Sequence, residues 1–188
     1  RKETSIQNHL DQRGIDMVND IDNDAERSKI ATDVMGTLGG FYGKEEAQHR
    51  FNVWKDKANN AIAQDTAAKS SALIESTLGT IGASGTVTPL NMEGIYGIIH
   101  RKNLDGTDAI PPTVQERMWS GFQQSAAQVL MMRDINTSKN PQAIIDGLNG
   151  DGHKIPWAKD SGEGFVSTEV DVRTILPEMT PTFINAAQ

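Results

Sequence analysis

The sequence of 188 residues predicts a mainly α-helical protein, an elongated multi-helix assembly with a C-terminal extended arm that contains one β-like segment. A stretch without proline, from Lys44 to Leu78, is rich in alanine and in polar residues that favour helices. Three later segments open with a capping residue or a proline, which is typical of helix starts: Thr88-Pro89, Pro111-Pro112 and Asn140-Pro141. From Asp151 onwards, glycine and proline become frequent and the helical spacing of apolar residues ends.

The composition indicates a thin hydrophobic core. Leucine, isoleucine, valine and phenylalanine together make up about a fifth of the residues, near the level at which a self-sufficient core becomes doubtful. We therefore expect neighbouring copies or other proteins to complete the packing. The formal charge of −7 argues against a dedicated nucleic-acid binder, because such proteins gain affinity by neutralising phosphates. Without cysteine, the chain has neither disulfides nor thiolate metal sites.

Residues 1–43 predict two N-terminal helices. The first carries apolar residues at heptad-like steps: Ile6, Leu10, Met17 and Ile21. Gly14 interrupts this helix and weakens it by about 1 kcal/mol relative to alanine. A second helix is expected to start at Asn23, with Glu26 at capping-box spacing, and to stop at the pair Gly39-Gly40.

Residues 44–150 predict a helical body built on the long helix that starts at Lys44. The apolar stripe of this helix begins with Phe51 and Trp54 and then thins to Ala58 and Ala61. A stripe so narrow stabilises a helix only when a neighbour packs closely against it, so we expect these four residues to contact an oligomer partner. The small, glycine-rich segment from Gly79 to Thr88 predicts a loop.

Residues 151–188 predict the extended arm. Apolar and polar residues alternate from Phe165 to Leu176, which indicates a β-strand. One side of this strand carries four residues that we expect to contact a partner: Val166, Val170, Val172 and Leu176. Because no second strand of comparable quality is visible, the segment is expected to add to a strand of a neighbouring chain. A solvated arm that merely wraps a neighbour, or a weak internal partner at residues 81–87, stays open as an alternative.

No residue pattern indicates a metal or cofactor site. The run Asn149-Gly150-Asp151-Gly152 is similar to the middle of a calcium loop, but Gly147 and Ala158 stand where side-chain ligands are needed. The four histidines are scattered and lack the spacing of metal ligands. We therefore expect no metal ligand and no cofactor.

The pair Glu75-Ser76, followed by residues 82–85, superficially resembles the Glu-Ser and Gly-Ala-x-Gly elements of lytic transglycosylases. In that family the glutamate is the general acid. The two elements lie too close together here, and Thr86-Val87-Thr88 replaces the family's Leu-Met-Gln continuation. We expect no catalytic residue, and a peptidoglycan-cleaving domain is kept as an alternative function, beside a non-enzymatic helical adaptor.

Three features resemble the internal virion proteins of tailed bacteriophages, also called ejection or pilot proteins. They are the polar stretch Phe51–Ser76, rich in alanine and glutamine, the succession of helices opened by a capped proline, and the segment Asn140–Asn149 with its Asn-Pro-x-Ala-x-x-x-x-Leu pattern. The resemblance covers residues 44–150. It implies a structural protein without catalytic residues, which oligomerises into a helical conduit for genome delivery across the host envelope.

The resemblance also implies partners and a location. The protein would contact copies of itself and other virion proteins, such as the portal or other ejection proteins, and DNA only as transiting cargo. It would lie in the capsid interior and move to the host periplasm or envelope on infection. Because the chain begins at Arg1 and not at methionine, we expect a processed product or a fragment of a longer chain that carries its chemistry elsewhere.

Overall fold

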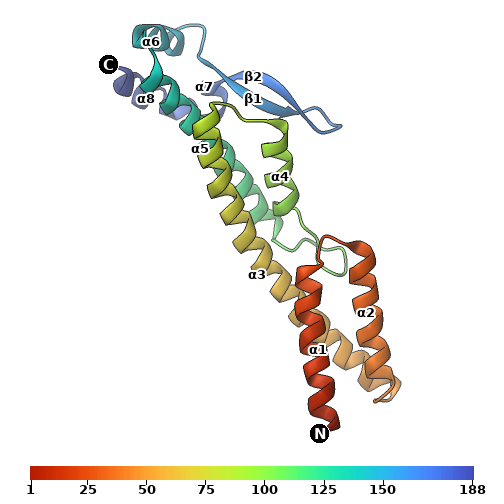
Figure 1. Cartoon of the computed structure of the whole chain (residues 1–188). Helices are drawn as coiled ribbons and strands as arrows, with labels where there is room; N and C mark the ends of the chain where they lie inside the picture. Colours follow the sequence, from red (N-terminus) through yellow and green to blue (C-terminus); the bar gives the residue numbers. More distant parts are fainter. The chain divides into compact units, whose positions relative to one another are not determined.

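The computed structural model covers residues 1–188 and confirms a mainly helical fold, with 72% of the residues in helices and one small two-stranded antiparallel sheet near the C-terminus (Figure 1). Its elements are α1 (Lys2–Asn19), α2 (Asp24–Gly39), α3 (Lys44–Ser84), α4 (Pro89–Ile99), α5 (Pro112–Thr137), α6 (Pro141–Asn149), β1 (Lys154–Asp160), β2 (Phe165–Asp171), α7 (Val172–Ile175), a 3-10 turn (Pro177–Met179) and α8 (Thr180–Ala187).

Capping side chains define three of the predicted helix starts. The Asn23 side chain accepts a hydrogen bond from the Glu26 backbone N–H, 3.2 Å away, and Asn140 does the same for the Ala143 N–H at 3.3 Å. At α4, Thr88 and Asn91 cap reciprocally, each side chain accepting from the other residue's backbone N–H. These bonds satisfy backbone donors that a helix start leaves unpaired, which is why the sequence signals were reliable.

The long helix α3 extends further than the sequence predicted. It continues through Gly79 and Gly82 to Ser84, so the loop expected from Gly79 is wrong for its first six residues. Ile81 is fully buried, and a Cβ added to Gly82 would lie 3.3 Å from the Val129 side chain. Close packing against α5 therefore outweighs the low helix propensity of glycine. The helix ends at Gly85, whose φ of +78° is left-handed.

The chain forms two compact units. The first consists of Arg1–Lys69 and His100–Pro112, and the second of Ser70–Ile99 and Thr113–Gln188. Each has its own cluster of buried apolar side chains. These units do not coincide with the three segments 1–43, 44–150 and 151–188, and that division stays a prediction.

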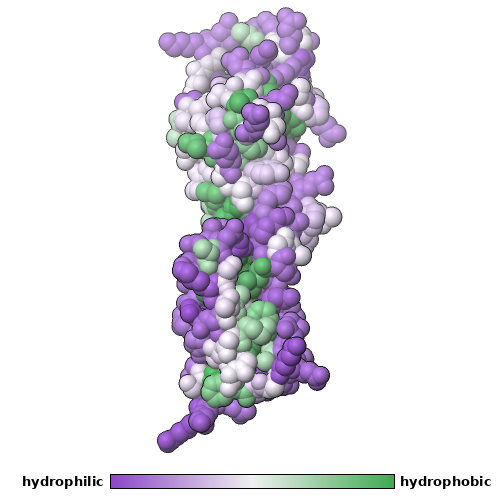
Figure 2. Space-filling model, turned by 90° about the vertical axis from the view of Figure 1, so that its right-hand side faces the viewer, coloured by the Kyte–Doolittle hydropathy of each residue, from purple (hydrophilic) through white to green (hydrophobic).

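Hydrophilic residues cover most of the molecular face in Figure 2, with smaller hydrophobic areas between them.

In the first unit, α1 and α2 pack together and α3 adds its N-terminal half. The predicted heptad-like seam is confirmed, since Ile6, Leu10 and Met17 of α1 are buried, as is Ile21 in the turn just after α1. Polar bonds join the same elements: Arg13 Nε donates to Asp33 at 2.7 Å. The segment 100–112 is held by Arg101, which pairs with Asp22 at 2.9 Å and with Asp65 at 3.3 Å.

In the second unit, α5 supplies the centre of the core. Its buried side chains include Phe122, Leu130 and Met131, none more than 1% exposed. Ile95 of α4 and Phe183 of α8 belong to the same cluster. Met131, with its flexible side chain, fills part of this core.

The predicted strand is not left without an internal partner. Strand β2 pairs with β1 as an antiparallel hairpin, with Ile155 opposite Val170 and Trp157 opposite Thr168. The expectation that it must add to a neighbouring chain is therefore wrong. Pro156 hid β1 in the sequence, since proline inside an apolar run argues against a strand. Its carbonyl faces away from β2 and accepts from the Val87 N–H at 3.3 Å, so the missing proline N–H disrupts no bond of the hairpin.

The extended arm is also shorter than predicted. Asp171 ends β2, and its side chain accepts from the Arg173 backbone N–H at 3.0 Å, which caps the short helix α7. Val172 and Leu176 therefore belong to a helical turn and the residue after it, and both are buried in the core of the second unit. The rest of the arm folds into a 3-10 turn and α8.

A tight polar corner holds the hairpin against the end of α6. Arg173 Nη2 donates to the Asp171 carboxylate at 2.7 Å, and Nη1 donates to the Gly150 carbonyl at 3.0 Å. Gly152 lies against this pair with a φ of +105°, and an added Cβ would overlap the Asp171 carboxylate and lie 2.8 Å from Arg173 Nη2. The corner therefore requires glycine at position 152 both for conformation and for space.

Gly152→Ala should lower the free energy of unfolding by roughly 3 kcal/mol, because it adds a steric clash to the cost of about 1–2 kcal/mol for a left-handed alanine. Gly162→Ala is the matched control, since Gly162 has a φ of +88° but open space around its Cα. It should show only the conformational cost. Urea unfolding followed by tryptophan fluorescence measures both variants, and equal losses would contradict the proposed crowding at the corner.

The second unit should become less stable at acidic pH, because Asp171 is then protonated. The Arg173 guanidinium holds the pKa of the Asp171 carboxyl below its usual range. Its stabilisation is therefore complete above the unfolded pKa of about 3.9 and is lost as the pH falls through the lower folded pKa. Asp171→Asn should be less stable than the parent at pH 7, and urea midpoints should converge below about pH 4. A difference that stays constant with pH would show that the charge contributes nothing.

Candidate helix-docking groove

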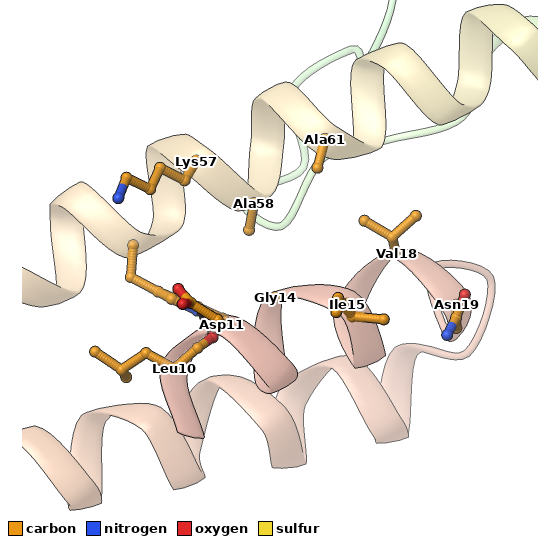
Figure 3. A pocket seen from close by; sticks show the side chains of 10 residues that line it. Leu10, Asp11, Gly14, Ile15, Val18, Asn19, Lys57, Ala58 and Ala61 are labelled. Carbon is orange, nitrogen blue, oxygen red and sulfur yellow. Dashed lines mark hydrogen bonds between the residues drawn. The ribbon is translucent and has the colours of Figure 1, made fainter. Parts of the chain in front are cut away.

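An open groove runs between α1 and α3 in the first unit (Figure 3). It has a volume of about 430 Å³ and is lined by Leu10, Asp11, Gly14, Ile15, Val18, Asn19, Trp54, Lys57, Ala58 and Ala61. A second hollow of about 260 Å³ shares Leu10, Asp11, Trp54 and Lys57 with it and reaches Gln7 and Glu46. The two hollows therefore lie next to each other between the same two helices, and we call them together the α1–α3 groove.

Small residues create the space in this groove. The Trp54 indole lies between the two helices, and its Nε1–H donates to the Leu10 carbonyl at 3.0 Å. Next to it, Gly14 has no side chain, and a Cβ added there would lie 3.9 Å from the indole nitrogen. Figure 3 shows Ala58 and Ala61 of α3 and Val18 of α1 facing the space between the two helices. The floor that these residues form is thus apolar.

The groove has the shape that an α-helix fits. Its walls are single helical faces, with α1 residues 7, 10, 11, 14, 15, 18 and 19 on one side and α3 residues 46 to 61 at steps of three and four on the other. At 1.5 Å per residue, the α1 wall is about 18 Å long. A short helix with an apolar face would find a matching length and a floor that permits close approach.

The rims carry apolar and charged side chains that are open to solvent. Ile15 on α1 is 55% exposed and Val53 on α3 is 44% exposed. Asp11 stands on the α1 rim and Lys57 on the α3 rim (Figure 3). Exposed apolar groups around a hollow are typical of surfaces that bind another protein.

The structure brings three of the predicted contact residues together. Trp54, Ala58 and Ala61 all line the α1–α3 groove. Phe51 is half-buried and packs on the Trp54 ring with centroids 5.7 Å apart, but it does not line the groove.

The four strand residues divide between surface and core. Val166 is 49% exposed on β2 and Val170 is half-buried, whereas Val172 and Leu176 are buried in the core of the second unit. A contact between these residues and a partner stays a prediction.

Sequence reasoning missed the α1 wall. Gly14 was interpreted only as a weak point of the helix, yet it occupies a position of the heptad-like seam, four residues after Leu10 and three before Met17. A glycine at a seam position leaves room for another helix, and that signal was available. Ile15, beside the seam, gave no signal because an isolated apolar residue on a polar face is common.

The other residues considered in the sequence, as a catalytic acid or as metal ligands, do not come together in a site. Glu75 is exposed on α3, whereas the general acid of that family lies in a partly apolar site. No three or more His, Cys, Asp and Glu side chains lie together as metal ligands. In the turn after α6, the position whose backbone carbonyl would bind calcium falls on His153, and that carbonyl accepts a hydrogen bond from the Val172 N–H at 2.9 Å. None of the helices has the length and apolar character to cross a bilayer.

No protein-family model, curated protein or solved structure matches this chain.

Gly14→Ala should raise the free energy of unfolding by about 0.5–1 kcal/mol, because it replaces glycine by alanine inside α1 without a clash. The added methyl meets the indole at an ordinary contact distance and reduces the groove. Gly36→Ala in α2 is the control: it has open space and should show a similar gain. Thermal unfolding by circular dichroism measures both, and destabilisation by Gly14→Ala alone would show that α1 and α3 already touch at this point.

Proposed function

We propose that this chain is a structural virion protein of a tailed bacteriophage, an internal or ejection protein that oligomerises into a helical conduit for genome delivery. The observation that carries the proposal is the α1–α3 groove, an open helical seam lined by Trp54, Ala58 and Ala61. An open helical seam of this kind can be covered by a helix of another subunit, as in oligomers whose subunits bury one another's apolar surfaces.

The length and composition of α3 support the same role. This helix has 41 residues, far more than the roughly 11–12 of an average helix. Most of its exposed positions hold polar residues or alanine, and one narrow apolar stripe is available for packing. Long helices with narrow seams are suited to building walls from repeated copies.

The charge of the chain is compatible with a DNA conduit. A net charge of −7 gives no general attraction to phosphates, so transiting DNA would not be held by the wall. In this proposal the protein contacts its own copies and other virion proteins, such as the portal or other ejection proteins. It lies first in the capsid interior and then in the host periplasm or envelope. The role requires neither a catalytic residue nor a cofactor.

The proposal is tested with purified virions of the phage that encodes the chain. Mass spectrometry should find the protein in DNA-filled particles and should show its loss from particles that have released their genome. Absence from filled particles would overturn the proposal and favour a helical adaptor. Release of muropeptides from purified peptidoglycan, abolished by Glu75→Gln, would instead establish the cell-wall-degrading alternative.

A further inference from the structure

We propose that the occupant of the α1–α3 groove is α1 of a second copy of this chain, related to the first by a twofold axis. In this dimer, α1 and α3 of both copies form a four-helix bundle. The inference rests on the proposed function, because it names the first contact through which the oligomer forms. Its physical basis is three properties of the groove: steric fit, charges of opposite sign on the two rims, and the pairing of the neighbouring charges within the chain.

The first property is steric: on α1, an exposed side chain stands next to a residue that has no side chain. Ile15 projects from α1 and is 55% exposed, while the neighbouring Gly14 leaves the floor without a side chain. In a twofold dimer each Ile15 can lie over the Gly14 of the other copy, so one contact occurs twice. Apolar side chains inserted between small residues of a facing helix are the usual packing of bundles.

The second property is charge of opposite sign on the two rims. Asp11 lies on the α1 rim and Lys57 on the α3 rim. A second α1 in the groove brings its Asp11 to Lys57, and the twofold axis brings Lys57 of the second copy to the first Asp11. A surface with both charges is complementary to itself, as a twofold interface requires.

The third property is that neighbouring charges are already paired within the chain. Arg50 Nε bonds Glu46 at 2.6 Å, and Arg13 bonds Asp33 at 2.7 Å. Because these charges are paired within the chain, they repel a second copy less than unpaired charges along the rim would. Asp11 and Lys57 remain as the rim charges that a second copy can pair, since Asp11 accepts only a side-chain amide hydrogen bond from Gln7 at 2.7 Å.

Light scattering after size exclusion tests the inference on the full chain. The parent protein should elute as a dimer of about 41 kDa, twice the 20.5 kDa of one chain. Ile15→Asp should raise the dissociation constant of the dimer by at least about tenfold, because it places a charge in the apolar centre. Leu90→Asp is the matched control: Leu90 is 78% exposed on α4 of the second unit, and its substitution should leave the dimer unchanged.

Charge exchange tests the pairing directly. Asp11→Lys alone and Lys57→Glu alone should each weaken the dimer, because each homodimer then has two repulsive contacts. A mixture of the two variants should recover dimer, since both cross-copy pairs are again of opposite sign. Circular dichroism should show that each variant keeps the helical content of the parent.

Three results would overturn the inference, and the first two are a parent chain that stays monomeric at about 100 μM and a mixture that dimerises no better than its components. Binding of another protein's helix by a monomeric chain would likewise overturn it. These outcomes are separate from the virion test, because a monomer found in filled particles would remove only the dimer, and a dimer absent from particles would remove only the virion role.

Discussion

The indole of Trp54 is the contact on which the first unit depends. It is 6% exposed, and it joins α1 to α3 by a hydrogen bond to the Leu10 carbonyl and by its apolar faces. A tryptophan side chain is large, so it holds the two helix backbones apart where the residues around it are small. The same residue thus stabilises the unit and keeps the groove open. One side chain thus serves both the packing of α1 on α3 and the spacing between them, in a chain with few large apolar residues.

The second unit is stabilised differently. Its core is continuous and includes residues from the helices and from β1, and its polar corner around Asp171 and Arg173 joins the hairpin to the end of α6. Most of its large apolar side chains are enclosed by the chain itself. The open seam lined by small residues lies between α1 and α3 of the first unit, away from the hairpin residues.

The helical part of the fold could be predicted from local signals. Asn23 and Asn140 mark helix starts because capping depends on a few neighbouring atoms, and the seam of α1 follows from spacing alone. The hairpin could not be predicted, since Pro156 disguises β1 and its tolerance depends on which way its carbonyl faces. The end of α3 was missed for a similar reason, because the fit of Gly82 against Val129 is a tertiary contact. For the groove, the alanine stripe of α3 was visible in the sequence, whereas the opposing wall required the pairing of α1 with α3.

The free edge of the hairpin has a further consequence. The backbone carbonyl of Pro156 points away from β2, so the backbone N–H and C=O of its partner Glu169 point away from β1. These groups of Glu169 therefore belong to the outer edge of β2, a strand of seven residues. A short edge that carries a carboxylate is a poor template for another strand, because like charges meet when two such edges approach. The outer edge of β2 is therefore a poor site for the strand-by-strand addition that leads to amyloid-like aggregation.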